Sequence, residues 1–184
     1  NTEALRFFSR ALELTPEANL EARREVLLAR VKIYHLLGER TAEIQDLDAL
    51  DKIAAQQQKP LEQAQVALLR AQMAEAVSDY TVAVATAQAI LALPQAAREP
   101  GLLAEAALTL GRARWRQQQY AAAHQSLADA AAWAQQAGKQ RTQAEIVRLR
   151  GAIASETGDF DTARIHYQQS LQIYQTCAYL PGQA

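Results

Sequence analysis

Apolar side chains recur along the chain at steps of three and four residues, which places them on one face of a helix. The clearest stripes lie between residues 102 and 174, where one pattern occurs twice, forty residues apart. An offset kept by so many packing residues predicts stacked structural repeats. The paired positions are Gly111 and Gly151, Tyr120 and Phe160, Ala123 and Ala163, Leu127 and Tyr167, Ala131 and Leu171, and Trp133 and Ile173.

Each repeat divides into two helical halves. The second half carries the apolar stripe, and the first carries small residues that let two helix axes approach closely, such as Ala104, Ala107 and Gly111. Between the halves of the last copy, Gly158 suits a left-handed helix end and Asp159 suits an N-cap. Each repeat is therefore predicted to be an antiparallel helical hairpin.

The same register predicts turns at Gly38, Ser78, Gln118 and Gly158. Thr15, Pro16 and Glu17 have the order typical of a helix start, namely an N-cap, a proline at N1 and an acid in the first turn. We expect inner helices near 17–37, 61–77, 101–117 and 140–157, and outer helices near 4–14, 41–57, 79–93, 120–137 and 160–176.

The predicted fold class is all-α, a right-handed α-solenoid of about nine helices. We expect one repeat domain over residues 1–184, made of a half-repeat (1–15), hairpins (16–58, 59–95, 99–138 and 139–177) and a loose tail (178–184). Residues 95–99 are interpreted as a linker between the second and third hairpins. Because the chain opens on Asn1 within a helical pattern, we expect it to be a fragment of a larger protein.

The third hairpin resembles a tetratricopeptide repeat. It has Leu110-Gly111, then Tyr120, Ala123, Leu127 and Ala130, and the fourth hairpin keeps Gly151, Gly158, Phe160, Ala163, Tyr167 and Leu171. A repeat of forty residues, against the usual ~34, is similar to the long-helix variety found in regulatory arms of signalling ATPases and transcription regulators. The resemblance implies a superhelix whose inner helices line a concave groove for a protein segment.

Some positions depart from the family pattern. Arg150 replaces the leucine before the glycine, and Arg114 stands where an aromatic residue is common. In the first hairpin, Arg40 and Glu43 replace the aromatic residue and the alanine, so this hairpin is the weakest copy.

Composition favours a binding protein over an enzyme. Nineteen basic and twenty acidic residues leave a net charge of −1, which gives no global nucleic-acid or membrane footprint. No phosphate-binding glycine loop, HExxH helix, GxSxG elbow or CxxC pair occurs, so neither catalysis nor a metal or other cofactor is expected. No apolar run approaches the ~18–20 residues that span a bilayer. The lone Cys177 fits a reducing compartment, and we expect a cytoplasmic location.

Basic residues are concentrated in the second half of the chain. Residues 98–150 hold eight basic and four acidic side chains, and they are densest at Arg112, Arg114, Trp115 and Arg116. Arginine beside an aromatic ring suits carboxylate or phosphate recognition. In the alternative interpretation, these arginines pair with neighbouring carboxylates while their stems cover apolar surface.

The inward-facing stripe that the resemblance implies gives the candidate partner-binding residues. It lacks the lysines and asparagines with which the family's best-known groove grips a terminal carboxylate, so that function is not carried over. We expect an acidic or amphipathic segment of a protein partner to contact mainly Arg112, Trp115 and Arg148. The candidates are Lys32, His35, Gln72, Glu75, Glu105, Leu108, Arg112, Trp115 and Arg148.

The sequence therefore predicts a protein–protein interaction module, part of a larger signalling or transcription-regulatory protein. One alternative is a nucleic-acid-binding array that uses the arginine and tryptophan spot, although near-zero net charge argues against it. Another is self-association through apolar ends, for which the candidate residues are Leu5, Phe8, Leu12, Ile173 and Tyr174.

Overall fold

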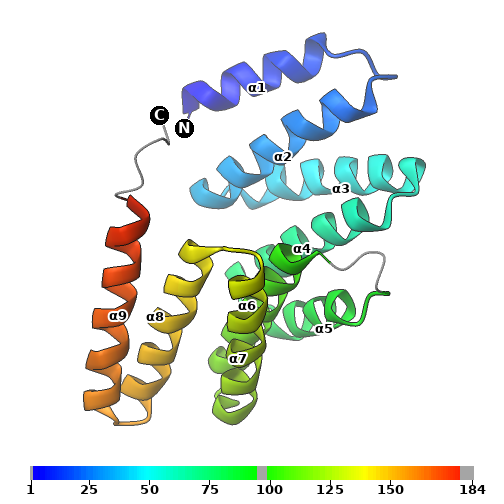
Figure 1. Cartoon of the computed structure of the whole chain (residues 1–184). Coiled ribbons are helices and arrows are strands. Elements are labelled where there is room, and N and C mark those ends of the chain that lie inside the picture. Colours follow the sequence, from blue (N-terminus) through cyan, green and yellow to red (C-terminus); the bar gives the residue numbers. More distant parts are fainter. Residues whose placement is uncertain (1, 95–98, 179–184) are drawn as a thin grey trace.

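The described part of the chain, residues 2–94 and 99–178 of a computed structural model, folds into nine α-helices and no strand (Figure 1). The all-α solenoid is thus confirmed. The linker expected at 95–99 falls outside the described residues except for Glu99, and the tail expected at 178–184 falls outside them except for the backbone of residue 178. The helices are α1 (Thr2–Leu14), α2 (Leu20–Leu37), α3 (Arg40–Gln57), α4 (Pro60–Ala76), α5 (Tyr80–Leu91), α6 (Pro100–Arg116), α7 (Tyr120–Gln136), α8 (Gln140–Glu156) and α9 (Phe160–Ala178).

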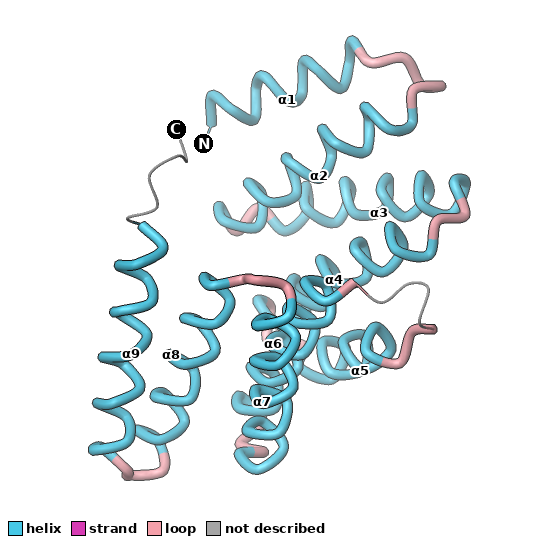
Figure 2. The backbone as a smooth tube through the Cα atoms, in the orientation of Figure 1, coloured by secondary structure: helices cyan, strands magenta, loops and turns pink. Residues whose placement is uncertain are grey.

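The helices pack in sequence order as hairpins. α2 pairs with α3, α4 with α5, α6 with α7, and α8 with α9, and the outer helix of each hairpin packs on the inner helix of the next. The inner helices α4, α6 and α8 also touch in succession, while α1 packs on α2 as a half-repeat. In Figures 1 and 2, α1 to α3 run across the view and α6 to α9 run down it, so the array turns along its length. No described helix is long and apolar enough to cross a lipid bilayer.

The hairpin turns follow the forty-residue register. Gly38, Ser78, Gln118 and Gly158 all have left-handed backbone conformations, with φ of 75°, 64°, 60° and 85°. After each, the next amide donates to a carbonyl five residues back, the hydrogen bond of a Schellman helix end. These bonds join Glu39 to Tyr34, Asp79 to Ala74, Gln119 to Arg114, and Asp159 to Ala154, at 2.8–3.0 Å.

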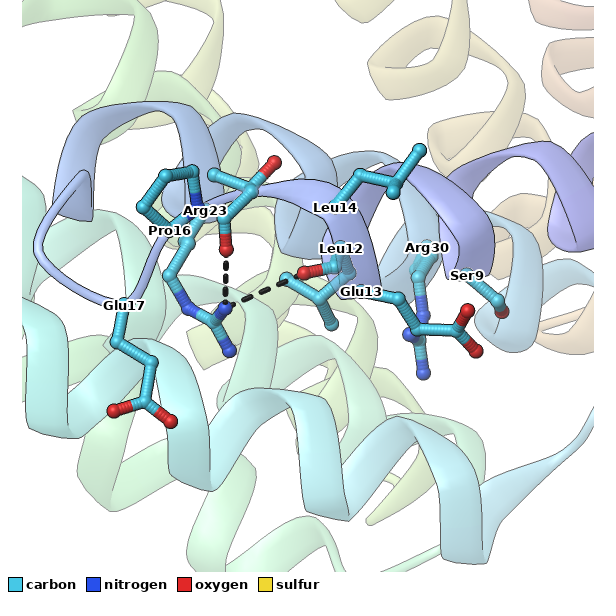
Figure 3. Close-up of a pocket in the computed structure, with 9 residues that line it drawn as sticks. Ser9, Leu12, Glu13, Leu14, Pro16, Glu17, Arg23 and Arg30 are labelled. Carbon is cyan, nitrogen blue, oxygen red and sulfur yellow. Dashed lines mark hydrogen bonds between the residues drawn. The ribbon is translucent and has the colours of Figure 1, made fainter.

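The start of α2 differs from the expectation. The predicted start at residue 17 is wrong, because the Thr15 hydroxyl donates to the Ala11 carbonyl and so belongs to the end of α1. Asn19 is the N-cap instead, and its side chain accepts the Ala22 amide at 3.2 Å. Figure 3 shows Arg23 reaching back from α2 to donate to the carbonyls of Leu12 and Thr15, across a hollow of about 530 Å³.

The third and fourth hairpins share the largest core. Leu127 on α7 is fully buried between α6 and α8, and a Cβ on Gly111 would lie only 2.9 Å from its side chain. Gly111 is therefore the close approach that the small-residue stripe predicts. The forty-residue register predicts that Tyr167, the counterpart of Leu127, is also buried between helices, and this prediction is wrong. One edge of its ring packs over Gly151, but no further inner helix among the described residues covers it, and 42% of the residue is exposed.

The first hairpin replaces an aromatic–alanine pair with an ionic cluster. Glu43 stands where Ala83, Ala123 and Ala163 pack, and its carboxylate is 1% exposed. Arg40 and the Nδ1 atom of His35, 2.7 Å away, both contact this carboxylate. Paired in this way, a buried carboxylate is tolerated where the other hairpins have a small apolar side chain.

Candidate partner-binding surface

The nine candidate residues fall into several separate groups on the inner helices. Three of them, Glu105, Leu108 and Arg112, line a hollow between α6 and α8 of about 470 Å³, called here the α6/α8 pocket. Lys32, His35 and Gln72 line a second hollow between α2 and α4. Trp115 lies near the hairpin turns, Arg148 lies beside the α6/α8 pocket, and Glu75 is half-buried on α4 outside both hollows. The other residues of the α6/α8 pocket are Lys139, Arg141, Thr142, Glu145 and Tyr174.

Glu145 is the centre of the polar contacts in the α6/α8 pocket. Arg112 donates to its Oε1 atom at 2.9 Å, and Arg148 donates to both carboxylate oxygens at 2.9 and 2.6 Å. The Tyr174 hydroxyl, from α9, donates to Oε2 at 2.9 Å. Nearby, Thr142 donates to Glu105 at 2.7 Å, which gives a second link between α8 and α6.

These contacts set the protonation of the pocket. The pKa of Glu145 is lowered to about 2, mainly by the hydrogen bonds from Arg148, with the charge of Arg112 and the Tyr174 hydroxyl adding to them against the opposing effect of burial. Glu145 in turn raises the pKa of Arg148. Burial first, and Glu145 second, raise the pKa of Tyr174. Glu145 is therefore a carboxylate whose charge is already compensated.

Most of the basic spot seen in the sequence is engaged within the protein. Arg112 and Arg148 share Glu145, Arg114 donates to the Ser126 hydroxyl and the Ala122 carbonyl, and Arg150 donates to the Leu127 carbonyl. The interpretation that these arginines pair with neighbouring carboxylates therefore holds for Arg112 and Arg148, whereas Arg114 and Arg150 donate to a hydroxyl and to backbone carbonyls. The cations that remain at the pocket mouth are Lys139 and Arg141, which are exposed and make no side-chain hydrogen bond or ion pair with the described residues.

Trp115 is partly a packing residue. Its ring lies against the core cluster of α6, α7 and α8, its Nε1 atom donates to Glu156 at 2.7 Å, and Arg116 stacks over it at 4.3 Å. The half-exposed ring borders a hollow of about 280 Å³ that Gln118 and Tyr120 also line. Through this exposed part, Trp115 stays a predicted partner contact.

A second hollow of about 230 Å³, the α2/α4 pocket, is mainly apolar. Val31, Leu36 and Leu69 form its walls, and Leu36 is 76% exposed at its edge. The candidates Lys32, His35 and Gln72 give it a polar side, together with Glu43. Lys32 is exposed there and makes no ion pair within the described part of the chain.

Several residues of these pockets were not among the candidates. Tyr174 was missed because it comes from an outer helix, and the inward stripe was drawn on inner helices alone. Glu145 carried a signal, since it lies forty residues after Glu105 on the same stripe. Leu36 and Arg141 lie off the stripe, at the ends of helices. Within residues 2–94 and 99–178, no group of three or more His, Cys, Asp or Glu could hold a metal ion.

The fold and its inner-face pockets define a helical-repeat solenoid. The crystal structure of aspartyl phosphate phosphatase F from Bacillus subtilis is similar, with a TM-score of 0.77 over 95% of this chain. That of BtubC (BKLC) from P. vanneervenii has a TM-score of 0.77 over the whole chain, and that of a MamA RS-1 ArsTM double mutant has 0.56 over 96%.

All three structures are 16% identical to this chain, so the likeness concerns the fold. The chain spans 46% of the phosphatase, 76% of BtubC and 97% of the MamA variant, and thus about half the length of the first. No family model matches the chain, and no curated protein matches it.

Proposed function

We propose that the chain is a tetratricopeptide-like protein-interaction module whose inner face binds an acidic or amphipathic segment of a partner protein. The observation that carries the proposal is the α6/α8 pocket, where two uncompensated cations, Lys139 and Arg141, stand beside Leu108 and Tyr174. An acidic side chain would meet the two cations, and an apolar neighbour would meet the half-exposed ring of Tyr174, since Leu108 is buried in the core with 2% exposed.

The two inner-face pockets have complementary chemistry. The α2/α4 pocket offers Leu36 and Leu69 to an apolar side chain, with Lys32 beside it. A segment with one apolar anchor and one acidic group suits both pockets, and the resemblance to tetratricopeptide repeats supports a groove of this kind. A place in the regulatory arm of a larger signalling or transcription-regulatory protein is part of this proposal.

The nucleic-acid alternative has less support. Duplex binding usually rests on several phosphate contacts. Of the arginines near Trp115, Arg112 and Arg114 are engaged by Glu145 and Ser126. With a net charge of −1, the chain offers little else to phosphates.

The test is selection of peptides from a random phage-displayed library on the immobilised chain, followed by calorimetric titration of the best peptides. We expect enriched peptides to combine acidic and apolar residues. Arg141→Glu and Leu36→Asp should each weaken binding by about tenfold or more. Arg6→Glu, at an exposed arginine of α1 that lines neither pocket, is the matched control and should leave the affinity unchanged.

Two results would overturn the proposal. One is enrichment of peptides that bind equally well to Arg141→Glu and to the unmodified chain. The other is a set of enriched peptides that carry basic residues and no acidic ones.

A further inference from the structure

A small hollow of about 280 Å³ lies where the turn of the third hairpin meets the end of α8. Trp115 and Arg116 line it from the end of α6, and Gln118 lines it from the turn. Tyr120 lines it from the start of α7, and Glu156 lines it from the end of α8. We call it the Trp115 hollow. It combines two half-buried aromatic rings with one exposed cation and one exposed carboxylate.

The Trp115 hollow lies in the middle of the array. α6 packs on α5 and α7, and α8 packs on α7 and α9, so the helices that line the hollow have described neighbours on both sides. Forty residues either side of Trp115 stand Glu75 and Ser155, and neither is aromatic. On α4, Ala76 stands where Glu156 stands on α8. An indole ring beside a carboxylate is therefore specific to this junction of two hairpins.

The face of the Trp115 ring already holds a cation. The guanidinium of Arg116 lies over the ring, 4.3 Å from its centre, in a cation–π contact. Arg116 makes no ion pair or side-chain hydrogen bond with the described residues. The contact shows that the ring face accepts a planar cation. Because Arg116 is exposed, its side chain can leave the ring for water without breaking an ion pair.

Glu156 supplies a negative charge beside the ring. Its Oε2 atom accepts the indole N–H of Trp115 at 2.7 Å, which holds the carboxylate at the edge of the ring. Glu156 forms no ion pair with the described residues, Arg116 included. A second guanidinium can satisfy both groups, since it stacks through its plane and donates to a carboxylate through its edge. A lysine ammonium has no planar face to stack, so it suits the hollow less well.

We infer that the Trp115 hollow binds an arginine side chain of a peptide ligand, whose guanidinium stacks on Trp115 and donates to Glu156. In the free chain, Arg116 occupies the ring face and acts as an internal competitor. A phosphate is a poor occupant, because it would face the unpaired carboxylate of Glu156. The site is separate from the α6/α8 pocket and does not depend on the function proposed for that pocket.

The experiment titrates the full, isotope-labelled chain with the peptide Gly-Arg-Gly, acetylated and amidated at its ends, and follows the indole N–H signals by NMR. The chain has two tryptophans, so Trp115→Phe identifies the signal of Trp115. We expect that signal to shift saturably, with a millimolar dissociation constant. The same peptide with citrulline, the neutral urea analogue of arginine, should bind about fivefold more weakly or less tightly still, because it keeps the shape and loses the charge.

Two variants test the roles of the charged residues. Glu156→Gln keeps an oxygen for the indole N–H but removes the charge, and it should weaken arginine binding by about threefold to tenfold. Arg116→Ala frees the ring face and should tighten binding by about twofold to fivefold. Gln119→Glu is the matched control, since it makes the same change in net charge at an exposed residue of the same turn that does not line the hollow. It should tighten binding less than Arg116→Ala does.

The outcomes separate this site from the other pockets. Equal binding of the arginine and citrulline peptides to the unmodified chain would overturn the inference, and so would equal binding to Glu156→Gln. Equal tightening by Arg116→Ala and Gln119→Glu would overturn it too, because Arg116 would then act through its charge alone. Arg141→Glu, which tests the α6/α8 pocket, should leave arginine binding unchanged. Circular dichroism melting of each variant checks that the fold is kept.

Discussion

The indole Nε1 atom of Trp115 on α6 donates a hydrogen bond of 2.7 Å to Oε2 of Glu156 on α8. The bond joins the third hairpin to the fourth near their turns, so we expect Trp115 to contribute to stability as well as to binding. A double-mutant cycle with Trp115→Phe and Glu156→Gln should give a coupling free energy of about 0.5–1 kcal/mol in urea unfolding. Additive effects of the two changes would show that the bond does not hold the hairpins together.

Leu127 and Tyr167 occupy equivalent register positions but differ in burial. Leu127→Ala should lower the free energy of unfolding by about 2–5 kcal/mol, because it opens a cavity between three helices. Tyr167→Ala, at a ring covered on one edge, should cost less than about 2 kcal/mol. The measurement is chemical denaturation of both variants. Equal losses would contradict the difference in packing.

Replacing a left-handed turn residue other than glycine by glycine should stabilise the fold. Gln118 has φ of 60°, a conformation that costs a residue with a Cβ atom ~1–2 kcal/mol, whereas glycine adopts it freely. After the entropy that glycine loses on folding, Gln118→Gly should raise stability by roughly 0.5–1 kcal/mol. Gly158→Ala, the reverse change at φ of 85°, should lower it. Thermal melting of both variants gives the comparison.

Acid should loosen the link between α6 and α8. The pKa of Glu145 is lowered from 4.5 to about 2, so its stabilising contribution is complete above pH ~4.5 and is lost as pH falls towards 2. Allowing for solvent screening, we expect ~1–2 kcal/mol from this group. The stability difference between the unmodified chain and Glu145→Gln should therefore shrink by that amount between pH 6 and pH 2.5. A constant difference would mean that Glu145 is not held ionised by Arg148.

The ionic cluster of the first hairpin should be replaceable by the pair found in the other hairpins. Arg40→Ala leaves the carboxylate of Glu43 buried with one partner fewer, and we expect a loss of ~2–4 kcal/mol. The double variant Arg40→Tyr with Glu43→Ala restores the aromatic and alanine of the register and should be near the stability of the unmodified chain. A double variant less stable than Arg40→Ala would show that the first hairpin depends on its ionic cluster for stability.

The sequence predicted the array well where local chemistry and packing agree. Left-handed turns at Gly38 and Gly158, and the buried Leu127, follow from a register repeated in every hairpin. The start of α2 was predicted too early because Thr15 and Pro16 have the order typical of a helix start. In the structure, the Thr15 hydroxyl donates to the Ala11 carbonyl at the end of α1. Tyr167 was misjudged because periodicity marks the apolar face of a helix and says nothing of whether a neighbour covers it.

The binding surface was harder to predict for a similar reason. Arg112 and Glu145 are thirty-three residues apart, and only the packing of α6 beside α8 brings them to 2.9 Å. Whether an arginine is free or paired depends on such distances between repeats. Arg141 had no distinguishing signal, because its place in the sequence does not show whether a neighbouring carboxylate engages it. Which cations are available for a partner therefore had to come from the structure.

The attachment of α1 gives the array a direction of unfolding. None of the residues of α1 is buried, and α2 is its packing partner among the described helices. In a solenoid each element depends on its neighbours alone, so the helix with the least buried surface opens first and the loss passes along the chain. Amide hydrogens should therefore exchange fastest in α1 and slowest in α6, α7 and α8, whose side chains form the largest shared core. A protease should therefore cut within α1 before the other helices have opened.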